Sequence, residues 1–132
     1  MLYLMVDFER LIMTWKYFDR AEFGCPCGCQ ENKISDELID KLENAREYAR
    51  RPFRINSGYR CAKHNAEIGG SPTSSHLKGL AADIHCTNGK DRYFIMQALL
   101  RADFRRIEDA PTWLHVDIDL DKENPTIFHK GD

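Results

Sequence analysis

Two histidines and one aspartate have the side-chain types and the sequence setting of a catalytic metal site. His76 lies in a polar stretch, Asp83 follows in a short apolar run, and His115 lies in a second apolar run. Catalytic zinc commonly takes three protein ligands of nitrogen and oxygen type and keeps one position for water. Such a water ionises near neutral pH and attacks a carbonyl that the metal polarises. We therefore predict that His76, Asp83 and His115 bind one Zn²⁺ ion.

Three local elements must bring these side chains together. Residues 71–79 are too rich in turn-forming residues for a helix or strand, so we predict a loop that carries His76. Residues 80–84 read as a buried strand, in which a carboxylate such as Asp83 is costly unless it is paired or binds a metal. Residues 113–118 read as a second strand with positions 113, 115 and 117 on one face.

The remaining segments are predicted from hydrophobic periodicity and from capping residues. They comprise helices over 36–50, 62–68 and about 91–102, and strands over 53–56 and 105–107. We expect an N-terminal extension over 1–16 and a loose polar tail over 121–132. Together these segments predict a single α+β domain over residues 1–132, with helices packed on a small antiparallel sheet.

The composition is that of an ordinary soluble globular protein. Of the 132 residues 42% are hydrophobic and 30% are charged, and the formal net charge is -2. This charge gives no strong attraction to nucleic acid, and no apolar run reaches the roughly 20 residues that span a bilayer. The N-terminus lacks the features of a signal peptide. We therefore expect a monomer that is made in the cytoplasm without nucleic-acid or membrane partners, and that reaches a cell wall only by another route.

The residues from Ser74 to Asp83 match the S-x-H-x-x-G-x-A-x-D signature of M15-type zinc peptidases, which the chain resembles. The upstream S-G-Y-R element, residues 57–60, is also similar, and residues 61–70 resemble the small phage and prophage branch. The family includes D-Ala-D-Ala carboxypeptidases, dipeptidases and phage endolysins that cut the L-Ala-D-Glu bond. The resemblance implies the same three zinc ligands and a zinc site like that of the DD-peptidases and the hedgehog domain. It also implies that peptidoglycan stem peptides are the substrate.

The general base is the point at which the sequence departs from this family. Many relatives carry Glu or Asp three residues before the last ligand, where this chain has Thr112, and others carry His where it has Trp113. Hydrolysis still needs a proton acceptor beside the zinc-bound water. Asp117 shares a strand face with His115 and could fill this role or orient a ligand, with Asp109 in the preceding turn as its competitor and Glu108 next.

Arg60 is the remaining candidate for the catalytic machinery. The resemblance implies that it contacts substrate or stabilises the developing oxyanion. A guanidinium can also grip a carboxylate with two parallel hydrogen bonds, which suits stem peptides because these carry free carboxylates. A surface or ion-pair arginine is the alternative.

Two further classes of function stay open at this stage. A zinc-stabilised module that binds a cell wall or a protein without catalysis is favoured by the missing acid at position 112. The hedgehog domain, which resembles this family, keeps a zinc site and acts by binding. A virion part that binds wall without cutting it is the other alternative.

The five cysteines, Cys25, Cys27, Cys29, Cys61 and Cys86, form no obvious framework. Their odd number and the expected cytoplasmic synthesis argue against full disulfide pairing. The C-x-C-x-C spacing also differs from the C-x-x-C of zinc ribbons. Thiols without a role, one disulfide that includes Cys61, and a second structural metal all remain open.

Overall fold

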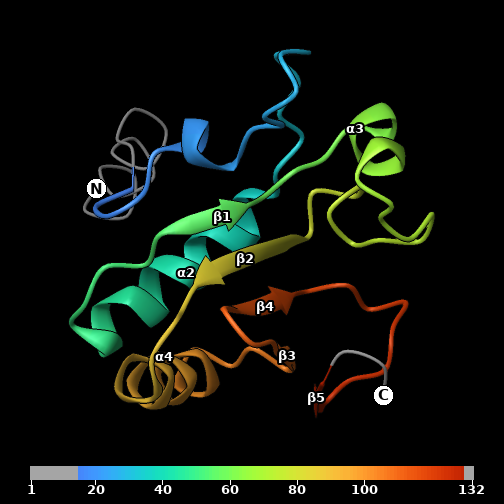
Figure 1. The fold of residues 1–132 in the computed structure, drawn as a ribbon. Helices are drawn as coiled ribbons and strands as arrows, with labels where there is room; N and C mark the ends of the chain where they lie inside the picture. The colour runs from blue at the N-terminus through green and yellow to red at the C-terminus, as the bar shows by residue number, and fades with distance from the viewer. Residues whose placement is uncertain (1–14, 130–132) are drawn as a thin grey trace, which may run out of the picture.

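The computed structural model describes residues 15–129, so most of the predicted extension over 1–16 lies outside the described residues. Figure 1 shows the chain from its N-terminus to its C-terminus. The helical elements are η1 (Arg20–Phe23), α2 (Asp36–Ala49), α3 (Ala62–Glu67) and α4 (Gly89–Arg101). The strands are β1 (Ile55–Ser57), β2 (Ala81–His85), β3 (Arg106–Asp109), β4 (Trp113–Asp117) and β5 (Thr126–Phe128).

The strands form one five-stranded sheet in the order β1-β2-β4-β3-β5. The pairs β1/β2, β2/β4 and β4/β3 are antiparallel, and β5 pairs with β3 in parallel. The predicted α+β class is confirmed, although the sheet is mixed because of its last strand. The predicted strand over 105–107 does pair with the His115 strand. It extends to Asp109, however, so Asp109 lies in β3 and not in the turn where we expected it.

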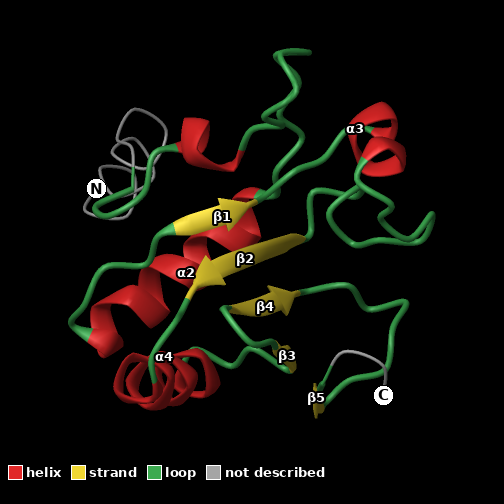
Figure 2. Cartoon of the chain, in the orientation of Figure 1, coloured by secondary structure: helices red, strands yellow, loops and turns green. Residues whose placement is uncertain are grey.

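The long helices α2 and α4 pack on one face of this sheet, as Figure 2 shows in red against yellow. In β2, β3 and β4 the apolar side chains of that face come from every second position and are fully buried. The two helices add side chains at helical spacing to the same core. The core includes Leu38, Leu42, Ile84, Leu99, Ile107, Leu114 and Val116. The intervening strand positions form the opposite face, which is mostly polar and also carries Trp113.

Local capping explains where the two long helices begin and end. The hydroxyl of Ser35 accepts a hydrogen bond from Leu38 N at 3.4 Å, and the amide oxygen of Asn88 accepts one from Asp91 N at 2.8 Å. Helix α2 ends at Ala49 because Arg50 adopts the left-handed conformation, with φ of 54°.

The predicted loose tail over 121–132 is wrong for residues 126–128, which form the edge strand β5. Thr126, Ile127 and Phe128 pair in register with Arg106, Ile107 and Glu108. The guanidinium of Arg106 also lies 4.5 Å from the centre of the Phe128 ring. A three-residue strand leaves almost no periodicity in a sequence, and its stability comes from the neighbouring strand rather than from its own residues.

The loop that carries His76 is fixed to the rest of the fold at two points. The hydroxyl of Ser75 and the ammonium of Lys78 both donate to buried Asp119, at 2.7 Å and 3.0 Å. Gly79 has φ of 70°, and its carbonyl accepts a hydrogen bond from Ser35 N at 2.8 Å. A Cβ at Gly79 would collide with the carbonyl oxygen of Lys33. Glycine at this position is therefore needed both for its conformation and for the close approach of two backbones.

We expect Gly79→Ala to lower the free energy of unfolding by about 3 kcal/mol or more, because strain and a backbone collision add. Gly69→Ala is the matched control: Gly69 has φ of 73°, but a Cβ there meets nothing within 4 Å. The control should cost only about 1 to 2 kcal/mol. Urea unfolding of both variants measures the difference, and equal losses would show that the contact with Lys33 is unimportant.

Candidate metal centre

Strand pairing brings two of the predicted ligands face to face. Asp83 on β2 lies directly opposite His115 on β4 in the antiparallel register. Asp83 Oδ1 is 2.9 Å from His115 Nδ1. Because opposite residues of such a pair share one face of the sheet, both side chains lie on the face away from α2 and α4.

His76 reaches the same point from its loop. The residue is only 2% exposed, and its Nδ1 lies 2.7 Å from the carbonyl oxygen of Gly58. A carbonyl can only accept, so Nδ1 carries the proton and Nε2 presents its lone pair. That lone pair is directed at Asp83, with Nε2 3.3 Å from Oδ1.

Asp117 holds the other side of the His115 ring. Its Oδ2 lies 2.8 Å from His115 Nε2 and accepts from Arg106 Nε at 3.1 Å, while its Oδ1 accepts from Asp119 N at 3.1 Å. These contacts hold a proton on Nε2, which leaves Nδ1 to act as a ligand. Of the two roles considered for Asp117, this buried position matches the orienting one, since the contacts already occupy both carboxylate oxygens.

The electrostatics of the site are those of an imidazole ring held between two carboxylates. Burial disfavours the charged ring of His115, but the hydrogen bonds to Asp117 and Asp83 outweigh it and raise the His115 pKa to about 9. Burial likewise opposes the charge of Asp83, yet the hydrogen bond with His115 holds its pKa well below the usual range. A cation between these groups would replace the proton that His115 holds.

The three donor atoms fit a metal ion. One ligand atom each from His76, Asp83 and His115 lie within 4.8 Å of one another. Zinc bonds of about 2.1 Å in a tetrahedron need donor atoms roughly 3.4 Å apart. The observed separations of 3.3 Å and 2.9 Å from Asp83 Oδ1 require only a small adjustment. The donor set of two imidazoles and one carboxylate is also one that zinc accepts.

Asp109 is not brought to this group. It lies opposite Leu114 in the register of β3 and β4, on the face that packs against the helices. Its carboxylate pairs with Arg92, whose guanidinium also donates to the carbonyls of Cys86 and Pro111. Asp109 therefore belongs to a structural link between α4 and the β3–β4 turn.

Glu108, unlike Asp109, lies on the same face of the sheet as His115. It is directly opposite His115 across β4 and β3, and it is half-buried. A row of residues thus crosses the polar face of the sheet: Ser57, Asp83, His115, Glu108 and Phe128. Directly opposite residues have Cβ atoms about 5 Å apart, which brings the Glu108 carboxylate within reach of the space beside His115.

Arg60 is held close to the same site. Its Nη1 donates to Asn65 Oδ1 at 2.8 Å, and its backbone N donates to the carbonyl of His76 at 3.1 Å. Its Nε is buried and has no hydrogen-bond partner among the described residues. Burial lowers the pKa of the Arg60 guanidinium, and the charge of Asp83 opposes this. Arg60 as a whole is partly exposed, and a guanidinium in such a position suits an anionic ligand.

The supporting groups were not identified from the sequence. Arg106 stands in the predicted strand over 105–107, but nothing local indicates that it pairs with Asp117. The contact between the Gly58 carbonyl and His76 cannot be predicted from the side chains, because the carbonyl belongs to the backbone. The only available signal was the S-G-Y-R element, whose glycine now has a reason: a Cβ on Gly58 would lie 2.6 Å from the Phe23 carbonyl oxygen.

A comparison with models of protein families gives a match over most of the chain. The sequence model of the family described as peptidase M15 matches residues 16–117, which include all three candidate ligands and Arg60. A search of curated proteins gives no match. Among the described residues, no helix has the length and apolar character needed to cross a membrane.

We expect Asp117→Asn to weaken zinc binding at this group by about 10- to 100-fold, because the ring of His115 loses the charge that orients it. His85→Ala is the control, since His85 is an exposed residue two positions from Asp83 on the same strand. Competition with a chromophoric chelator measures both affinities, and circular dichroism checks the fold. Unchanged affinity in Asp117→Asn would contradict the orienting role.

Proposed function

The chain belongs to the M15 peptidase family, and we propose that it is a zinc-dependent hydrolase of amide bonds in peptidoglycan stem peptides. Family membership supports a metallopeptidase-type function in general terms. The observation that carries the more specific proposal is the convergence of His76 Nε2, Asp83 Oδ1 and His115 Nδ1, with the far nitrogen of each ring already occupied.

These three residues would hold the metal. When bound in a three-ligand site, zinc supplies a Lewis acid for the carbonyl and lowers the pKa of water at the open position. The protein's own contribution is to fix the two imidazole rings in advance, through the Gly58 carbonyl and through Asp117. Such fixed ligands need little rearrangement when the ion binds, which favours a catalytic site.

Arg60 would bind the substrate. Asn65 fixes its Nη1, and the residue as a whole remains partly exposed, so its guanidinium could contact a carboxylate or a carbonyl oxygen of the peptide. Stem peptides offer free carboxylates close to their scissile bonds, so this chemistry supports cleavage at either the D-Ala-D-Ala or the L-Ala-D-Glu bond. Activity in phage or prophage lysis is the corresponding biological proposal.

Glu108 is the carboxylate that we propose as proton acceptor. Asp117 is engaged by Arg106 and His115, and Asp109 is on the other face of the sheet, whereas Glu108 lies opposite His115. A base on β3 would replace the acid that many relatives carry three residues before the last ligand, where this chain has Thr112. It would take a proton from the attacking water and return it to the leaving amine.

Turnover of purified muropeptides, with and without a chelator, tests the proposed function. We expect release of amino acids or shorter peptides, loss of release on chelation and recovery on addition of zinc. The absence of acid at position 112 favours the alternative of a zinc-stabilised binding module. A protein that binds zinc and muropeptides but hydrolyses none of them would establish that alternative.

We expect Glu108→Gln to retain zinc and the fold but to lower kcat by roughly 100-fold or more, because the proton acceptor is removed. Asp109→Asn is the matched control, one residue away on the opposite face, and should leave kcat within a fewfold of wild type. Steady-state kinetics on one muropeptide gives both values. The reverse pattern would return the role to Asp109.

We expect Arg60→Lys to impair kcat/KM nearly as much as Arg60→Ala, since an ammonium lacks the planar pair of donors. The loss should correspond to roughly 2 to 4 kcal/mol, as for other donors that stabilise negative charge at a reacting centre. Zinc content must be measured in parallel. Wild-type kinetics in Arg60→Lys would remove the guanidinium from the substrate site.

A further inference from the structure

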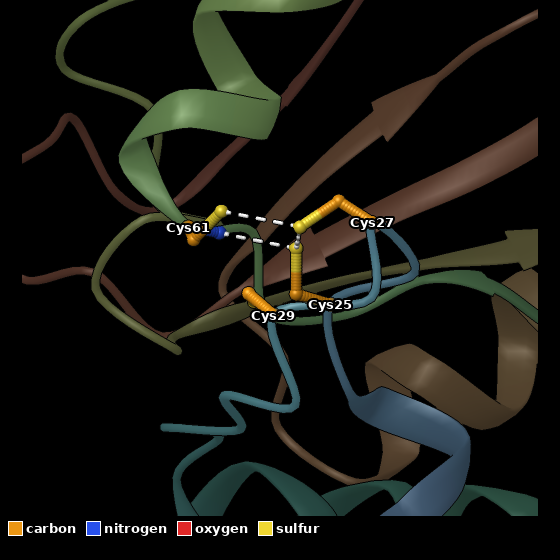
Figure 3. A group of neighbouring side chains, drawn as sticks. All are labelled: Cys25, Cys27, Cys29 and Cys61. Atoms are coloured by element: carbon orange, nitrogen blue, oxygen red, sulfur yellow. Dashed lines mark hydrogen bonds between the residues drawn. The ribbon is translucent and has the colours of Figure 1, made fainter.

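A second group of metal-ligand side chains lies apart from the first. Cys25, Cys27 and Cys29 from one loop meet Cys61 from a distant segment, as Figure 3 shows. The four Sγ atoms lie within 4.8 Å of one another. Cys27 Sγ is 3.4 Å from Cys25 Sγ and 3.5 Å from Cys61 Sγ. All four thiols are free.

The backbone folds the C-x-C-x-C loop so that its sulfurs point to one side. Gly28 has φ of 90° and Gln30 has φ of 63°, and these two left-handed residues reverse the chain around Cys29. Cys25 N then donates to the carbonyl of Glu31 at 3.2 Å, which closes the loop. The C-x-C spacing, which is unlike that of a zinc ribbon, is therefore accommodated by the sharp turn at Gly28.

Backbone amides already donate to three of the four sulfurs. Cys61 N, His64 N and Glu31 N lie 3.4 Å from the sulfurs of Cys25, Cys61 and Cys29 respectively. Such hydrogen bonds stabilise a thiolate more than a thiol, because the negative sulfur is the better acceptor. Lys63 and Glu31 both line the surface depression around Cys27 and Cys29, so the stabilisation of the thiolates comes from these amides.

The separations fit tetrahedral thiolate coordination better than disulfides. A disulfide needs sulfurs about 2.05 Å apart, and residues two apart in one tight loop can form one only with strain. Zinc–sulfur bonds of about 2.3 Å place the four sulfurs of a tetrahedron about 3.8 Å apart. The observed 3.4 Å and 3.5 Å lie near that value. Four thiolates without an open ligand position are typical of a structural site.

We propose that Cys25, Cys27, Cys29 and Cys61 bind a second Zn²⁺ ion, independently of His76, Asp83 and His115. Binding displaces the thiol protons to solvent, and the four thiolates with one Zn²⁺ carry a net charge of about -2. The ion fastens the 25–29 loop to the residue that follows Arg60. The same segment provides the Gly58 carbonyl that orients His76, so the second ion supports the first site through the backbone.

Metal content per chain tests the proposal without any assay of activity. We expect two zinc ions in the wild-type protein, one in His76→Ala/His115→Ala, one in Cys27→Ser/Cys29→Ser, and none in the combination. Cys27 and Cys29 are chosen because both are exposed, so serine there disturbs no core packing. Cys86→Ala is the control, since Cys86 is buried and lies outside the cluster, and it should keep both ions.

Cobalt substitution identifies the ligands. In His76→Ala/His115→Ala, Co²⁺ should show intense thiolate-to-metal charge-transfer bands and the visible bands of a tetrahedral site, and Cys27→Ser/Cys29→Ser should lose the charge-transfer bands. If the double cysteine variant fails to fold, Cys29→Ser alone and thiol titration of the wild type before and after chelation replace it. Absence of zinc from the double histidine variant would overturn the proposal. An intact mass lower by two hydrogens per disulfide would overturn it equally.

Discussion

The register between β2 and β4 is the constraint on which the candidate site depends. Asp83 lies opposite His115 only in this register, and a slip by one residue would turn either side chain toward the helices. The register is set by the other face, where Ile84 lies opposite Leu114 and Ala82 opposite Val116, all fully buried. The apolar core therefore determines which polar groups meet on the reverse side, and the metal site follows from hydrophobic packing.

The parts that the sequence predicts are those whose cause is local. Helix α2 follows from an N-cap at Ser35 and from apolar residues at helical spacing, and the structure confirms both. The alternation in 113–117 predicted which side chains share a face with His115. Asp83 stood out because a carboxylate within an apolar run needs a partner. In each case the decisive information lies within a few residues of the feature.

The parts that escaped prediction depend on contacts between distant residues. Arg106 meets Asp117 because β3 and β4 are neighbours, and the strand β5 exists because β3 offers it an edge. The choice among Asp117, Asp109 and Glu108 was open for the same reason. It depends on the register of β3 against β4, which places Glu108 and not Asp109 opposite His115. Short strands carry too little periodicity to fix that register in advance.

The two histidines reach the site by different physical means. His115 is fixed by a hydrogen-bonded sheet, whereas His76 stands in a loop without such a ladder and relies on separate side-chain and backbone contacts. Ser75 and Lys78 tie this loop to Asp119, and the Gly58 carbonyl fixes the ring itself. Gly58 in turn precedes Tyr59, whose amide donates to the Phe23 carbonyl at 2.7 Å, just before the cysteine loop. A change in the conformation of the cysteine loop would therefore affect the position of His76 more directly than that of His115.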